Sequence, residues 1–172
     1  AGKYGFGFSL KFQPPAGAEQ VLEQAAQKAF QQTAAELDGR FADAITGRNW
    51  DWPRASKRGV SGISLGEKAK NYARAKYNTN APRSIVDSGD LAGSRVFNKG
   101  KLEANWTWSI SYAAAVHDGA RIQPWGNKNA ATVELPARPW TDAVPIGGVG
   151  TYRGAVFPFT QETAQRMTHL LN

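Results

Sequence analysis

"KYGFGFSLKFQPPAGAEQVLEQAAQKAFQQTAAEL" (residues 3–37) changes its hydrophobic period at the two prolines, and this change predicts the fold. Before the prolines, apolar residues alternate with small or polar ones, as in a half-buried strand: Tyr4, Phe6, Phe8, Leu10 and Phe12. After them, apolar residues recur at steps of three and four, as in an amphipathic helix: Val21, Leu22, Ala25, Ala29, Phe30, Thr33 and Leu37. The helix begins near Ala18 and either breaks at Gly39 or continues to Gly47, because one glycine costs only about 1 kcal/mol.

The rest of the chain predicts short elements without a regular alternation of strands and helices. The expected elements are a helix over 67–77, a helical turn over 91–94, strands over 94–97, 102–111 and 131–135, and a helix over 160–171. A hairpin with its turn over 98–100 is expected to join the first two strands. In the strand over 102–111, Trp106 and Trp108 share one face and are predicted to be core residues. The chain is therefore expected to be one α+β domain over 1–172: a long amphipathic helix packed on a small antiparallel sheet, with extended loops and a C-terminal helix.

Two stretches lack either period and are predicted to be loops. Residues 47–64 form a long basic loop that contains Trp50 and Trp52, and residues 145–158 form a glycine-rich loop without a nucleotide-binding spacing. Tryptophan and arginine in a long loop are suited to contact with another subunit, or to stacking on nucleic-acid bases.

Composition excludes several classes of site. The chain has no cysteine and only two histidines, which excludes disulfides and cysteine-based zinc sites and disfavours a histidine-rich site, so we expect no metal. No apolar run is long enough to span a bilayer, and the amino terminus lacks the pattern of a secretory signal.

Positive charge is concentrated in the middle of the sequence. The formal net charge is +7, and residues 40–101 hold thirteen basic and five acidic side chains. A local excess of this size favours contact with a polyanion. The residues expected to contact DNA or an acidic partner are Lys57, Arg58, Lys68, Lys70, Arg74 and Lys76. A basic nucleic-acid-binding module is therefore one hypothesis for the whole chain.

His117 and Asp118 raise a second hypothesis, a hydrolase that pairs His117 with Asp87 or Asp90. A catalytic histidine needs a nucleophile and an orienting partner, and the sequence has no nucleophile elbow. The favoured interpretation is structural: His117 and Asp118 cap a turn over 113–116, and Gly119 takes a positive φ. Asp87-Ser88-Gly89-Asp90 is likewise interpreted as a turn that precedes a helical turn.

Three pieces occur in order: "IVDSGDLAGS" (85–94), "WSISYAAAVHDGARI" (108–122) and "LPARPW" (135–140). Together they resemble the neck or tail-completion proteins of tailed bacteriophages, which share a D/T-G-x-L-x-x-S, Y-A-x-x-V/H-x-G and P-A/P-R-P-F/W pattern. The resemblance covers residues 85–140 and a preceding amphipathic helix. It does not cover the first strand, the basic loop or the last helix.

The resemblance implies a structural virion protein without catalysis and without a cofactor. Such subunits assemble into a ring, commonly a hexamer, that joins head to tail or completes the tail tube. The implied partners are other copies of the chain, portal or adaptor proteins, tail tube proteins and DNA in the lumen; the implied location is the virion neck, after synthesis in the host cytoplasm. The residues expected at subunit contacts are Trp50, Trp52, Arg54, Arg121, Trp125, Arg138 and Trp140.

Overall fold

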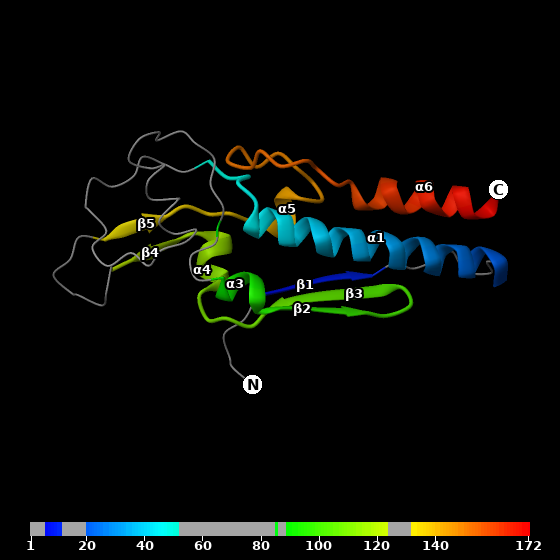
Figure 1. Ribbon diagram of the computed structural model, residues 1–172, viewed down its shortest axis with the longest axis horizontal. Helices are drawn as coiled ribbons and strands as arrows, with labels where there is room; N and C mark the ends of the chain where they lie inside the picture. Colours follow the sequence, from blue (N-terminus) through cyan, green and yellow to red (C-terminus); the bar gives the residue numbers. More distant parts are fainter. Residues whose placement is uncertain (1–5, 12–19, 52–84, 86–88, 124–131) are drawn as a thin grey trace.

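The structure is a computed structural model that describes residues 6–11, 20–51, 85, 89–123 and 132–172. In chain order its elements are β1 (Phe6–Lys11), α1 (Gln20–Thr46), α3 (Asp90–Gly93), β2 (Arg95–Lys99), β3 (Glu103–Trp108), α4 (Ala113–Asp118), β4 (Ala120–Ile122), β5 (Val133–Leu135), α5 (Trp140–Ala143) and α6 (Phe159–Leu171). Helix α1 lies between α6 and a three-stranded sheet (Figure 1). The expected α+β fold, with a long helix on a small antiparallel sheet and a C-terminal helix, is confirmed.

The three-stranded sheet is antiparallel, with β3 between β1 and β2. Trp106 pairs with Phe8 on one side and with Phe97 on the other. Alternation along β3 follows the predicted pattern, since Trp106 and Trp108 are buried and Thr107 is exposed. The β2–β3 hairpin is confirmed, but its turn lies slightly later than expected, closed by the N–H of Gly100 donating to the carbonyl oxygen of Glu103 at 2.7 Å.

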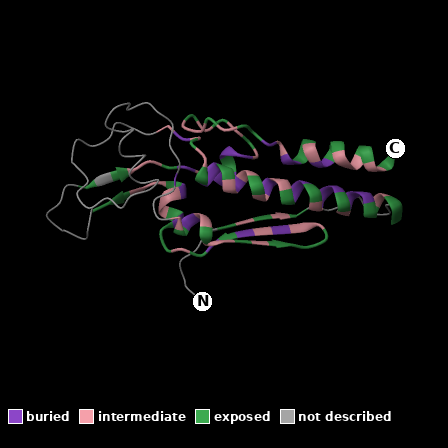
Figure 2. Cartoon of the chain, in the orientation of Figure 1, coloured by how far each residue is buried: buried purple, intermediate pink, exposed green. Residues whose placement is uncertain are grey.

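Helix α1 runs without interruption from Gln20 to Thr46, so Gly39 does not break it. The helix buries residues along its length because it is packed on two sides (Figure 2). Phe41 packs against the sheet, where its ring contacts Phe8, Trp106 and Trp108. On the other side of α1, Phe30 packs edge-on against Phe159 of α6, with ring centroids 5.6 Å apart. Helix α1 is therefore the middle layer, between the sheet and α6.

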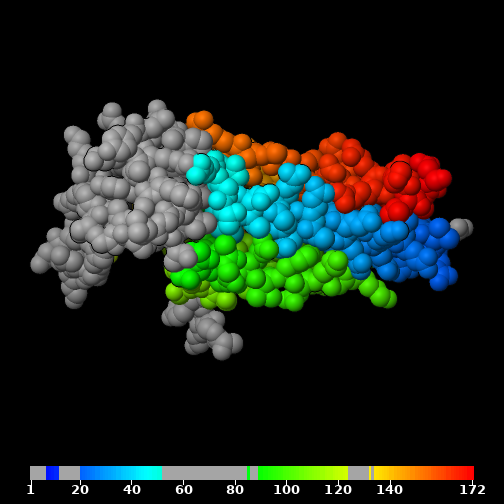
Figure 3. Space-filling model, in the orientation of Figure 1, coloured from blue at the N-terminus to red at the C-terminus, as the bar shows by residue number. Residues whose placement is uncertain are grey.

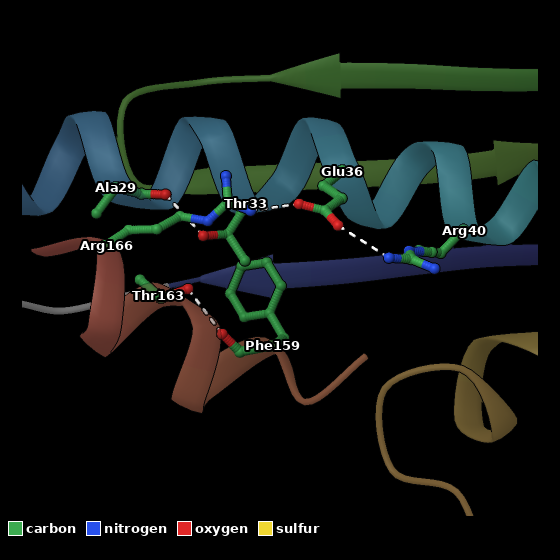
Figure 4. A network of polar contacts seen from close by, with 7 residues as sticks. All are labelled: Ala29, Thr33, Glu36, Arg40, Phe159, Thr163 and Arg166. Carbon is green, nitrogen blue, oxygen red and sulfur yellow. Dashed lines mark hydrogen bonds and ion pairs between the residues drawn. The ribbon is translucent and has the colours of Figure 1, made fainter. Parts of the chain in front are cut away.

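Polar contacts also hold α6 against α1 (Figure 4). Glu36 accepts hydrogen bonds from Arg166 of α6 and, at 3.1 Å, from Arg40 of its own helix. The hydrogen-bonded Arg40 holds the pKa of the Glu36 carboxyl below its usual value, and Arg166 acts in the same direction. The ion pair therefore links the two helices while both carboxylate and guanidinium groups stay partly exposed.

Three short elements were not expected from the sequence: α4, where only a turn was predicted, β4, which forms a two-stranded sheet with β5, and α5. The segment 145–158 contains no helix or strand beyond one bridge between Trp50 and Tyr152, in agreement with the predicted loop. The helix expected over 67–77 and most of the loop expected over 47–64 lie outside the described residues. In the described part of the chain, none of the helices has the length and apolar character needed to cross a membrane.

Candidate functional site

The three sequence pieces behind the resemblance fold together at the end of α1. Arg138, from the third piece, donates its backbone N–H to the carbonyl oxygens of Val116 and His117, from the second, at 3.2 and 3.0 Å. The first piece supplies α3, whose Leu91 is buried in the same core cluster as Trp108 and Trp140. Segments up to 50 residues apart in the sequence therefore form one packed unit, which we call the motif cluster (α3, α4, α5 and residues 136–139).

His117 is the central polar residue of the motif cluster. Its Nδ1 lies 2.5 Å from the carboxylate of Asp118, and its Nε2 lies 2.8 Å from the hydroxyl of Thr141. In the neutral imidazole with its proton on Nδ1, Nδ1–H donates to the Asp118 carboxylate and Nε2 accepts the hydroxyl proton of Thr141. The ring also packs edge-on against Trp140, with centroids 4.9 Å apart. His117 therefore joins α4 to α5 through one hydrogen bond, to Thr141, and one aromatic contact, with Trp140, while its bond to Asp118 lies within α4.

Asp118, His117 and Thr141 are hydrogen-bonded in the order acid, base and nucleophile of a hydrolase. In a hydrolase, however, the nucleophile must be accessible to the substrate. Thr141 is 2% exposed and His117 is 5% exposed, whereas the side chain of Asp118 is 66% exposed. The hydroxyl that would attack a substrate lies in the core, and the acid lies at the surface. This geometry supports a structural link.

The turn interpretation of these residues is corrected in one respect. His117 lies inside the last turn of α4 and bonds to α5, so it does not cap the turn over 113–116. Gly119 follows with φ 80° and ψ 158°, which confirms the predicted positive φ. Asp90 begins helix α3 as expected, while Asp87 lies outside the described residues.

Three residues expected at subunit contacts are buried inside the chain. Trp50 donates its indole N–H to the carbonyl oxygen of Ala44 at 2.7 Å. Trp140 packs against Trp108, and Arg138 donates to the carbonyl oxygen of Pro136 at 3.2 Å. The expectation that Trp50, Arg138 and Trp140 are exposed anchors is therefore corrected, because the core of the same chain already surrounds them.

Arg121 is the one predicted contact residue that the described part of the chain places at the surface. Its side chain is 75% exposed on β4 and lies 3.8 Å from Glu134 on β5. The remaining predicted contacts lie outside the described residues: Trp52, Arg54, Lys57, Arg58, Lys68, Lys70, Arg74, Lys76 and Trp125.

The chain is attached near the last turns of α1 on both sides of residues 52–84, which we call the basic segment, and the first attachment includes the bond from the Trp50 indole to the carbonyl oxygen of Ala44. Before the basic segment, residues 49–51 pair with residues 151–153: Asp51 N–H donates to Thr151 O, and Arg153 N–H donates to Asn49 O, both at 2.7 Å. After it, Ile85 N–H donates to Ile45 O at 3.0 Å. The residues directly before and directly after the basic segment therefore both lie at the C-terminal end of α1.

Tyr152 strengthens this attachment by packing on Trp50, with ring centroids 4.9 Å apart. Burial raises the pKa of the Tyr152 phenol. Next to it, Arg153 lies 2.5 Å from the carboxylate of Asp51. An aromatic contact, an ion pair and backbone hydrogen bonds therefore fix the chain directly before the basic segment.

Sequence reasoning missed Thr141 and the pairing of residues 49–51 with 151–153. Thr141 directly follows the "LPARPW" piece, but no periodicity marks it as the partner of His117. The pairing joins segments about 100 residues apart, and a tight turn predicts only pairings between neighbouring segments.

Within the described ranges, no group of three or more metal-ligating side chains is present. No family model matches the chain, and neither a curated protein nor a solved structure matches it.

Proposed function

We propose that this chain is a structural subunit of the neck of a tailed phage. It forms a ring that joins head to tail or completes the tail tube, and it acts by assembly, without catalysis and without a cofactor. The observation that carries the proposal is the motif cluster: the second piece is hydrogen-bonded to the third through Arg138 and to the first through Ser94 and Ser109, and all three pieces contribute side chains to the core. Three matches that pack as one unit support a common fold more strongly than three separate matches.

The arm formed by β4 and β5 supports a role in assembly. Its two strands have three residues each, and a two-stranded hairpin is only marginally stable alone in water. Ile122 on this arm is 42% exposed, and Arg121 is exposed beside it. An arm with an apolar side chain and an arginine is suited to contact with a neighbouring subunit.

Native mass spectrometry tests the ring, and we expect one closed oligomer of the purified chain. The variant Arg121→Glu is expected to weaken it, whereas Lys28→Glu, an equal charge change at an exposed position on α1, is expected to leave it intact. Density of an assembled head-to-tail junction provides the second test. A chain that is monomeric at high concentration and absent from purified particles would overturn the proposal.

A second candidate function is nucleic-acid binding, and the charge of the basic segment favours it. Residues 52–84 hold eight basic side chains and one acidic side chain, so they account for the whole net charge of +7. The rest of the chain has thirteen of each and is neutral. Binding to phosphates would then depend on this one segment and would weaken steeply with salt.

Fluorescence anisotropy with labelled duplex and single strands tests this second function. Replacing Lys68, Lys70, Arg74 and Lys76 by Gln is expected to reduce both the affinity and its salt dependence. The matched control replaces four basic residues elsewhere: Lys11, Lys28, Lys99 and Lys101. No binding at low salt, or equal losses in both variants, would exclude the basic segment as a nucleic-acid site.

A further inference from the structure

We draw no further inference here: the strongest candidate, the polar groove between α1 and α6 (Figure 3), carries nothing because its cations Lys28 and Arg166 are balanced by Glu162 in the groove and by Glu36, which pairs with Arg166, so that its charge selects no class of ligand.

Discussion

The two sides of α1 are packed by different means. On the sheet side, the Phe41 ring contacts Phe8, Trp106 and Trp108 with centroid distances between 5.4 and 5.9 Å. On the α6 side there is one such pair, Phe30 with Phe159, and beyond it the contact depends on alanines, threonines and the ion pair of Glu36.

This difference indicates where the stability of the fold lies. Apolar burial stabilises in proportion to area, and a tryptophan or phenylalanine buries two to three times the area of an alanine. An ion pair between partly exposed groups contributes at most about 1 kcal/mol. We therefore expect the sheet side to hold most of the stability and the α6 side to set the position of α6.

Trp106→Ala, on the sheet side, is expected to lower the free energy of unfolding more than any other variant proposed here. Trp106 contacts Phe8, Phe41 and Phe97, and its indole N–H donates to the carboxylate of Asp38 at 3.2 Å. Removing a buried aromatic side chain costs about 3–5 kcal/mol in the free energy of unfolding. Urea unfolding measures it, with the exposed Tyr112→Ala as control; a loss below 1 kcal/mol would show that the sheet side is not the core.

Gly119→Ala tests how firmly the backbone is held where α4 of the motif cluster ends. With φ 80° and ψ 158°, Gly119 occupies a region open essentially to glycine, and a Cβ there would lie 2.9 Å from Ala137 N and Leu135 O. We expect a loss of about 3 kcal/mol. Gly89→Ala is the matched control, since its φ is also positive but its Cβ would meet nothing within 4 Å, and about 1 kcal/mol is expected there. Equal losses would mean that the backbone around Gly119 yields.

Thr141→Val tests the link between α4 and α5 at nearly constant volume. The change removes the hydroxyl that bonds to Nε2 of His117 and leaves a buried acceptor without that donor. A loss of about 1–2 kcal/mol is expected in thermal or urea unfolding. Thr107→Val, the same change at an exposed position on β3, is expected to alter stability by less than about 0.5 kcal/mol. A neutral Thr141→Val would show that the aromatic contacts alone hold the two helices.

Glu36→Gln, on the α6 side, is expected to lower the free energy of unfolding least, which would confirm that this side contributes less stability than the sheet side. Losing the ion pairs to Arg40 and Arg166 is expected to cost less than about 1 kcal/mol and to matter less at high salt. Because the pKa of Glu36 is lowered by folding, its contribution is present above the usual value of 4.5 and disappears as the pH falls through the folded-state pKa. Wild type and variant should therefore converge in stability at acid pH, and a difference that persists at pH 2 would contradict the ion-pair account.

Much of the fold was predictable because it depends on local periods. Alternation in residues 102–111 identified Trp106 and Trp108 as core residues, and apolar steps of three and four identified α1. The candidate site was less predictable: Trp50 and Trp140 were expected at subunit contacts and are buried. A tryptophan in a polar, irregular stretch has no periodicity to show which way it faces, so only its neighbours in space decide.

The sequence by itself determined the fold class, the long helix, the hairpin and the positive φ of Gly119, because propensity, period and turn chemistry act over a few residues. Only the tertiary structure decided that His117 bonds to Thr141 and that the chain attaches near the last turns of α1 on both sides of the basic segment. It also decided that α1 is buried on two sides. These contacts join residues far apart in the chain, and they form because three layers must cover one another's apolar surfaces.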